Sequence, residues 1–241
     1  MNRGIYPILS GALAQERQMQ VFSNNVANVN TAGFKQDESM FRSLVARSMG
    51  QVAPTGAEER VFVTAQGLKT VLDNGRFRKT GNPYDLAIRG SGFFEVKTAQ
   101  GLRYTRNGVF HLDGQRRLVT EMGDPVMGQR GPIKLEEGPV EVSPAGAIQV
   151  NGQEAAKIRV VEFPDNRPPQ KSENGLFSGD RPKPSKDAVV EVGYVEESNV
   201  NALTEMVKLI QGMRMYESAQ KLIQAFDHMT ELAVQDVGKV T

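Results

Sequence analysis

The chain has 241 residues, and its 29 Lys and Arg residues nearly balance its 28 Asp and Glu residues, so the formal net charge is +1. This balance gives no reason to expect a nucleic acid as a partner. The sequence contains no Cys, which excludes disulfides, thiolate catalysis and thiolate metal sites. The length allows one or two domains with real cores, and the 24 Gly and 12 Pro residues favour a turn-rich β protein over a helical bundle.

The start of the chain does not resemble a cleaved signal peptide, because its apolar run at residues 5–9 is short and contains Pro7. No run of 18 apolar residues occurs in the sequence, so a membrane-spanning helix is not expected. If the protein is exported, a signal of another kind must direct it.

From about residue 4 to residue 29, apolar residues recur in steps of three and four, which predicts a helix with one apolar stripe. Asn24, Asn25, Asn28 and Asn30 crowd its end, and Gly33 suits the positive φ that terminates such a helix. Two interpretations of the asparagines stay open. They cap the helix end, or Asn24 and Asn28 share a face and hydrogen-bond across to a partner helix.

The middle of the chain changes period. Residues 41–49 suggest a short amphipathic helix, after which short apolar runs alternate with turn sequences such as Asn107-Gly108 and Asp113-Gly114. This pattern is typical of an antiparallel sandwich or barrel. Strands are predicted at residues 61–64, 86–89, 93–97, 102–105, 109–112, 117–120, 125–127, 133–135, 140–142, 147–150, 157–163 and 189–196. The proline-containing stretch at residues 164–184 is predicted to be a surface loop.

From about residue 201 to residue 236, apolar residues again recur in steps of three and four without a proline, which predicts a helix roughly 50 Å long. A helix of this length needs a partner, and the N-terminal stripe is the candidate. The expected fold is therefore α+β, with a central antiparallel β domain and terminal helices that pair as a coiled coil. The expected segments are an N-terminal helix and motif at residues 1–35, an extended connector at 36–85, the β domain at 86–196 and the long helix at 197–241.

Residue patterns typical of enzymes are missing from the sequence. It contains no HExxH motif, no paired acidic residues at metal-binding spacing and no Gly-rich phosphate loop. Its two histidines, His111 and His228, are better explained as packed or solvated side chains than as ligands. The methionines of the last helix are at helical spacing and are interpreted as core residues. We therefore expect no enzymatic activity, no metal and no cofactor.

Several stretches resemble the bacterial flagellar axial family of rod, hook and hook-associated proteins. SNNVANVNTAGFK at residues 23–35 is similar to its N-terminal motif, with Val26 at a position more commonly Leu. SNVNALTEMVKLIQGMRMYES at residues 198–218 is similar to its C-terminal motif, and residues 84–96 and 103–128 resemble its central runs. The resemblance covers almost the whole chain. The short segment between residues 36 and 85 favours the proximal rod protein over the distal rod protein.

This resemblance implies a structural subunit that polymerises through its terminal helices into the rod of the basal body, across the periplasm. It implies export by the flagellar type III apparatus without a cleaved signal peptide. The implied partners are further copies of the chain, other rod proteins and the export apparatus, with neither nucleic acid nor membrane insertion. The assembly residues expected from the two motifs are Asn24, Asn25, Asn28, Thr31, Gly33, Phe34, Asn199, Val200, Met206, Ile210, Arg214, Tyr216 and Glu217.

Two other classes of function compete with this interpretation. One is a soluble β-domain module that binds peptidoglycan or another glycan and oligomerises through helical ends. The absence of Trp and the presence of only five Tyr argue against it, because glycan sites usually display aromatic residues. The other is a generic coiled-coil surface protein. Neither explains the motif at residues 23–35.

Overall fold

The computed structural model describes residues 5–46, 60–164, 167–185 and 187–238. The chain divides into two units, each built from segments that are far apart in the sequence. The helical unit comprises Met1–Ala27, Asp37–Lys69 and Asn201–Thr241, and the β unit comprises Asn28–Gln36 and Thr70–Val200.

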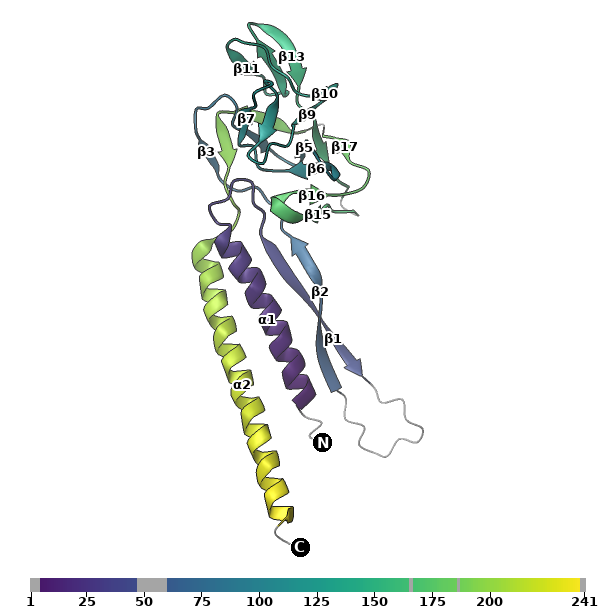
Figure 1. Cartoon of the computed structure of the whole chain (residues 1–241), viewed down its shortest axis with the longest axis vertical. Coiled ribbons are helices and arrows are strands. Elements are labelled where there is room, and N and C mark those ends of the chain that lie inside the picture. The colour runs from purple at the N-terminus through teal and green to yellow at the C-terminus, as the bar shows by residue number, and fades with distance from the viewer. Residues whose placement is uncertain (1–4, 47–59, 165–166, 186, 239–241) are drawn as a thin grey trace. The chain divides into compact units, whose positions relative to one another are not determined.

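The helical unit contains the two terminal helices and a β-ribbon. Its elements are α1 (Ile5–Ala27), β1 (Asp37–Ala46), β2 (Arg60–Thr70) and α2 (Ala202–Gly238). The two helices lie side by side, and β1 pairs with β2 alongside α1 (Figure 1). The two helices predicted from apolar periodicity are thus confirmed, with ends within a few residues of those expected.

The short helix predicted at residues 41–49 is wrong for the part that the structure describes. Residues 41–46 belong to β1, and residues 47–49 lie outside the described residues. The local spacing of apolar residues is compatible with a helix, but pairing with β2 supplies the backbone with hydrogen bonds from a distant segment. Tertiary context of this kind commonly overrides a weak local preference.

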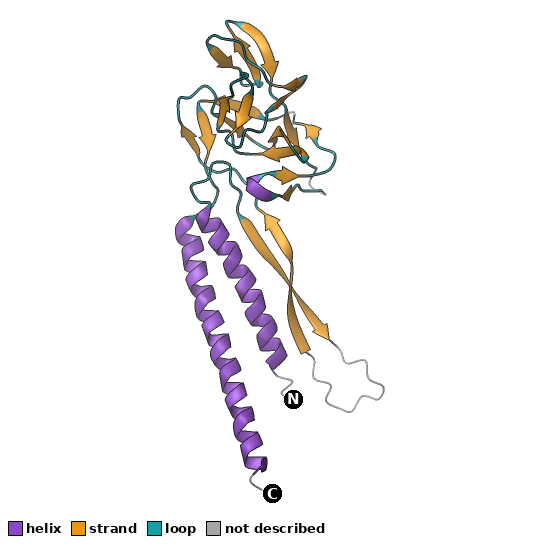
Figure 2. Cartoon of the chain, viewed as in Figure 1, coloured by secondary structure: helices purple, strands orange, loops and turns teal. Residues whose placement is uncertain are grey.

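The β unit is an assembly of short strands joined by turns (Figure 2). In the N-terminal half of the unit they are β3 (Phe77–Lys79), β4 (Leu86–Arg89), β5 (Phe93–Thr98), β6 (Gly101–Thr105), β7 (Phe110–Leu112), β8 (Leu118–Thr120), β9 (Met127–Gly128) and β10 (Gly131–Pro132). The remainder are β11 (Val140–Val142), β12 (Ala147–Val150), β13 (Gln153–Lys157), β14 (Val160–Glu162), β15 (Gln170–Lys171), β16 (Phe177–Ser178), β17 (Lys183–Pro184), β18 (Val189–Val192) and β19 (Tyr194–Glu196), with a short 3₁₀ turn at Glu173–Gly175.

The largest sheet has the strand order β15-β16-β6-β5-β14-β17, and smaller sheets pair β4 with β18, β3 with β19 and β7 with β8. The pairs whose register is defined are antiparallel, which confirms the antiparallel middle expected from the sequence. Strand β5 is buried on both faces. Phe94 lies in the main core with Phe110, whereas its neighbour Phe93 points to the other face and packs on Phe177.

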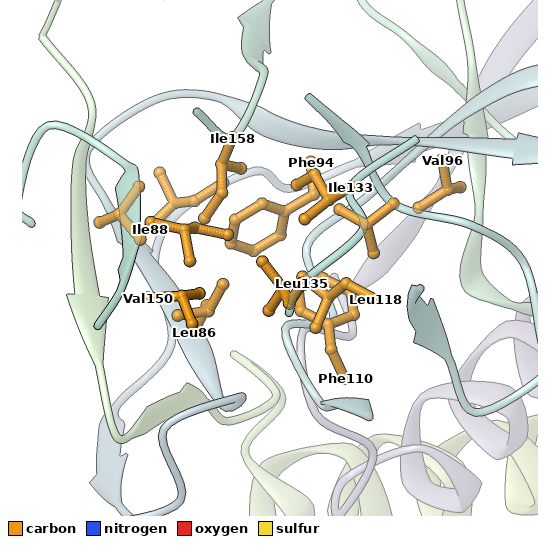
Figure 3. Packing of buried hydrophobic residues seen from close by; sticks show 13 residues of the cluster. Leu86, Ile88, Phe94, Val96, Phe110, Leu118, Ile133, Leu135, Val150 and Ile158 are labelled. Atoms are coloured by element: carbon orange, nitrogen blue, oxygen red, sulfur yellow. The ribbon is translucent and has the colours of Figure 1, made fainter. Parts of the chain in front are cut away.

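The main core of the β unit consists of aliphatic side chains gathered around Phe94 (Figure 3). Its members come from strands, turns and isolated bridges throughout the unit, and include Leu86, Ile88, Leu118, Ile133, Leu135, Ile148, Val150 and Ile158. The hydrophobic effect therefore holds together strands that are individually too short to be stable.

Other sequence predictions need correction. The strand expected at residues 157–163 is divided between the end of β13 and β14, and only Met127 of the strand expected at residues 125–127 belongs to β9. The single strand expected at residues 189–196 is interrupted at Gly193, whose φ is +72°, so that β18 pairs with β4 and β19 with β3. The expected loop at residues 164–184 contains β15, β16 and β17. Residues 133–135 are not a strand. Ile133 and Leu135 are nevertheless buried, and their amides donate to Val126 O and Arg116 O.

Candidate assembly interface

Helix α2 presents one row of sheltered residues to α1. This row, here called the inner seam, advances in steps of four and three, and its members are buried or half-buried: Glu205, Leu209, Gly212, Tyr216, Ala219, Ile223 and Phe226. On α1 the sheltered residues Ile8, Ala12, Gln15, Met19, Phe22 and Val26 follow the same steps. Alternating steps of four and three keep residues on one side of a helix.

Glycine at position 212 lets the two helices approach closely. A Cβ built on Gly212 would lie 2.9 Å from Gln15 Nε2 and 3.0 Å from Met19 Cγ. Nearer the start of α2, Lys208 Nζ lies 5.7 Å from the centre of the Phe22 ring. Contacts further along α2 are thus made earlier in α1, so the two helices run antiparallel.

Asn25 joins three elements of the helical unit. Its side-chain Nδ2 donates to Glu205 Oε2 at 3.0 Å and to Asp37 O at 2.9 Å, while its Oδ1 accepts from Asp37 N at 3.0 Å. Asn25 is fully buried and Glu205 is 1% exposed. Lys208 Nζ donates to the second oxygen of Glu205 at 2.7 Å. The buried Asn25 amide and the buried Glu205 carboxylate thus supply each other with a hydrogen-bond partner. Leaving either group unpaired would lower the stability of the fold.

The opposite side of α2 carries a second row, here called the outer seam: Leu203, Val207, Ile210, Arg214, Glu217 and Lys221. It also advances in steps of four and three, but it is offset from the inner seam by two residues, or about 200° around the helix. Every member is exposed, and Leu203 and Ile210 expose 74% and 52% of their surface. The side of α2 that does not meet α1 is therefore apolar from Leu203 to Ile210 and charged from Arg214 to Lys221.

The N-terminal motif ends inside the β unit. Gly33 N donates to Glu196 O at 2.7 Å, and a Cβ at Gly33, whose φ is +67°, would overlap the backbone of Arg106 and Asn107. The Phe34 ring is buried beneath Lys171, whose Nζ lies 3.6 Å from the ring centre. Only glycine fits the space and the backbone conformation at position 33.

Behind this turn lies a buried ionic cluster. Lys35 Nζ donates to Glu196 Oε1 at 2.6 Å and to Asp73 O at 2.7 Å, and Arg106 Nη1 donates to Glu196 Oε2 at 3.3 Å. The Gly75 amide donates to the same carboxylate at 2.9 Å. Burial lowers the pKa of the Lys35 ammonium and of the Arg106 guanidinium, although the Glu196 carboxylate opposes both shifts.

The predicted assembly residues at the start of the C-terminal motif also have contacts within the β unit. Asn199 Nδ2 donates to Val71 O at 2.9 Å, and its Oδ1 accepts from Gln36 N at 2.7 Å. Val200 is buried, with 8% of its surface exposed. Asn199 thus connects the residue that follows the N-terminal motif with the segment that follows β2.

The remaining predicted residues lie in different environments. Asn24 and Thr31 are exposed, and Thr31 Oγ1 donates to Asn28 Oδ1 at 3.1 Å. Met206 is exposed beside the outer seam, and Met213, Met215 and Met229 are exposed as well, so the interpretation of these methionines as core residues is wrong for a single chain. Tyr216 lies on the inner seam and is half-buried. The structure thus distributes the predicted set over the two seams, the interior of the β unit and other exposed positions.

Sequence reasoning matched Lys35 and Glu205 to the family motifs but did not include them among the assembly residues. It did not identify Arg106 and Glu196 as partners of the N-terminal motif, or Gly212 as a contact of α1. The sequence signal that could have pointed to these partners was a charged residue inside each motif, Lys35 in the N-terminal one and Glu205 in the C-terminal one. Nothing in a single sequence shows that Lys35 meets Glu196, because 161 positions separate them.

Within the ranges that the structure describes, no group of three or more His, Asp or Glu side chains could hold a metal ion. None of the described helices is long and apolar enough to cross a membrane.

Comparison with known proteins identifies the family. Three family models match successive parts of the chain: "Flagella basal body rod protein" at residues 5–35, "Flagellar hook protein FlgE/F/G D1 domain" at residues 87–159 and "Flagellar basal body rod FlgEFG protein C-terminal" at residues 191–235. The flagellar basal-body rod protein FlgF of Caulobacter vibrioides is 33% identical over 246 residues, which cover 100% of both chains. The chain belongs to the flagellar basal-body rod protein family. The family inferred from the motifs is therefore confirmed.

Other relatives are also named as flagellar basal-body rod proteins, either FlgF or FlgG. FlgF of Mesorhizobium japonicum is 30% identical over 247 residues, covering 99% of both chains. The rod protein FlgG of Buchnera aphidicola subsp. Acyrthosiphon pisum is 30% identical over 247 residues, covering 92% of this chain and 95% of the relative. The resemblance to FlgF extends over the whole chain, and the resemblance to FlgG over most of it.

Proposed function

We propose that the chain is a structural subunit of the proximal part of the flagellar basal-body rod, without enzymatic activity. The full-length similarity to proteins named FlgF supports this place over the distal one, which the FlgG relatives represent. In this proposal the protein is exported by the flagellar type III apparatus without a cleaved signal peptide. Its partners are further copies of itself and neighbouring rod proteins.

The single observation that carries the proposal is the double seam of α2. The inner seam pairs with α1 as an antiparallel coiled coil, which its steps of four and three support. The outer seam leaves Leu203, Val207 and Ile210 exposed on the other side of the same helix. Exposed apolar rows of this kind are unfavourable in water and mark interaction sites. A neighbouring subunit that covers the outer seam would bury it.

A contact of this type is heterologous, because the surface that binds differs from the surface that is bound. Its repetition generates an open helical filament when the rotation between copies does not close a ring. Met206, Ile210, Arg214 and Glu217 are the predicted residues best placed for contacts between subunits. The contacts of Asn25, Gly33, Phe34 and Asn199 support a role in positioning parts of one chain.

The experiment compares two exposed methionines. Met206→Asp places a charge beside the outer seam, and Met122→Asp makes the same change in a turn of the β unit, where the side chain is 63% exposed. In a flagellated bacterium that lacks its own FlgF, the wild-type gene and Met122→Asp should restore swimming, and Met206→Asp should not. Restoration by Met206→Asp would contradict assembly through α2. Restoration of a strain that lacks FlgG, but not of one that lacks FlgF, would assign the distal position.

A further inference from the structure

The C-terminal part of α2 extends beyond the start of α1. The register set by the Glu205–Asn25 contact, continued at about 1.5 Å per residue in each helix, places Ile5 opposite about residue 225. Helix α2 continues to Gly238, past the described start of α1 (Figure 1). Residues 227–238 are here called the overhang. Within it, Met229 and Leu232 expose 54% and 47% of their surface.

The overhang is acidic. It carries Asp227, Glu231 and Asp236, and the sequence contains no Lys or Arg from residue 222 to residue 238. Asp227 and Glu231 are exposed and, four residues apart, lie on one side of the helix. The basic group closest to them among the described ion pairs is His228, whose Nδ1 lies 3.9 Å from Glu231 Oε2.

The exposed side of the middle of the same helix carries two basic residues, with Glu217 between them. Arg214 and Lys221 belong to the outer seam, seven residues apart, and neither takes part in a described ion pair. Lys208, in contrast, donates to the buried Glu205 carboxylate. Arg214 directly follows the exposed apolar residue Ile210 on the outer seam. An acidic segment would find its complement here.

The two charged segments cannot meet within one chain, since they belong to one continuous helix. We infer that the overhang of one copy packs against the outer seam of α2 in a second copy, with Asp227 and Glu231 beside Arg214 and Lys221. This inference rests on the proposed function and specifies which surfaces meet. Matching the two segments in parallel helices shifts the second copy along the helix axis by about 20 Å.

Charge selects this stagger over an unshifted arrangement. Two parallel copies at equal height would place overhang beside overhang, with acidic residues facing acidic residues. Like charges at short distance disfavour a pairing, and opposite charges favour the register in which they meet. In a staggered pair, the overhang of one copy and the outer seam of the other are still uncovered, so a third copy can add in the same way.

The first test reverses charge on each side of the contact in the full-length chain. Asp227→Lys with Glu231→Lys changes the overhang, and Arg214→Glu with Lys221→Glu changes the outer seam. Each pair of substitutions should raise the protein concentration needed for self-association, measured by sedimentation at low ionic strength, by at least about fivefold. The control for the overhang variant, Glu121→Lys with Glu154→Lys, changes the net charge by the same amount at two exposed residues of the β unit and should have no effect.

Mixing the two altered proteins provides the decisive comparison. Each should associate poorly alone, whereas the mixture restores opposite charges at every contact and should associate about as well as the wild type. Equal association of all variants, or no recovery in the mixture, would overturn the inference while leaving the proposed function intact. If the wild type and both variants fail to associate with themselves or with another rod protein, the proposed function fails as well.

Cysteine cross-linking tests the contact without bulk polymerisation. The chain has no cysteine, so Arg214→Cys together with Asp227→Cys introduces the only two thiols. These positions are about 20 Å apart on one helix, which equals the proposed stagger, and they cannot form a disulfide within that helix. Mild oxidation should give a ladder of covalent oligomers, and the control pair Glu121→Cys with Asp227→Cys should not. A ladder of equal strength from the control pair, or none from the test pair, would exclude the staggered register. Oligomers that form only with another rod protein would assign the outer seam to that partner.

Discussion

Asn25 Nδ2 donates a hydrogen bond to Glu205 Oε2 at 3.0 Å, across 180 positions of sequence, and both residues are buried. This contact joins the N-terminal motif to the C-terminal motif. The adjacent asparagine, Asn24, is exposed on the same helix. A buried asparagine at a helix seam can specify register, because only one alignment satisfies its amide. The pair therefore serves as the reference point for the alignment of α1 with α2.

Replacing Asn25 by Ala should destabilise the helical unit by about 2–3 kcal/mol, because it removes the amide from Glu205 and from both backbone groups of Asp37. Asn24→Ala is the matched control and should change the free energy of unfolding by less than about 1 kcal/mol. Urea unfolding followed by helical circular dichroism measures both. Similar losses for the two variants would show that burial of the amide is not what matters.

Gly33→Ala should destabilise the β unit by at least about 3 kcal/mol, since the new methyl group would combine a strained φ with overlap on the Arg106 backbone. Gly81→Ala separates these two effects. Gly81 has a φ of +78° but no atom near a Cβ, so the loss there should be about 1 kcal/mol. Thermal unfolding followed by tyrosine absorbance gives the comparison. Equal losses would mean that the motif turn packs less tightly on Arg106 than the structure indicates.

Lys35→Met should cost about 3–5 kcal/mol, because Glu196 would keep its buried charge and lose its closest cation. The exposed Lys97 offers the matched control, and Lys97→Met should be nearly neutral. Denaturant unfolding of the β unit measures the difference. A neutral Lys35→Met would indicate that Arg106 alone balances the carboxylate.

The lowered pKa of Lys35 also predicts a pH dependence. Burial places its pKa in the folded state below the unfolded value of about 10.4, so between the two values the unfolded chain binds more protons. The contribution of Lys35 to the free energy of unfolding should therefore rise with pH across that window. The difference between wild type and Lys35→Met, measured by denaturation at several alkaline pH values, should grow with pH. A constant or shrinking difference would contradict the direction of the shift.

Much of the inner seam is only half-buried in one chain, and the outer seam is exposed. We therefore expect the terminal helices to be only partly ordered in a dilute monomer and to gain order on assembly. Far-UV circular dichroism of the full chain should show helicity that rises with concentration or on polymerisation. Full helicity at the lowest concentration, unchanged on assembly, would contradict coupled ordering.

The sequence by itself determined the two terminal helices, the antiparallel middle and the family. Each of these is recorded locally: helices by steps of three and four, hairpins by turn sequences such as Asp113-Gly114 between β7 and β8, and the family by motifs at both ends. A local pattern can be recognised without knowledge of what packs against it. The roles predicted for Met206 and Ile210 rest on the same local pattern. The exposure of these two side chains becomes apparent only in the structure, where α1 covers the opposite side of the helix.

Only the tertiary structure decided which residues of the motifs meet one another. It showed that Asn25 pairs with Glu205 inside the helical unit, whereas Lys35, ten positions later, pairs with Glu196 inside the β unit. It also turned residues 41–46 from a predicted helix into a strand. The physical reason is common to these cases. Burial of a charge or an amide, and the pairing of a strand, depend on segments brought together from distant positions, and a single sequence does not record those distances.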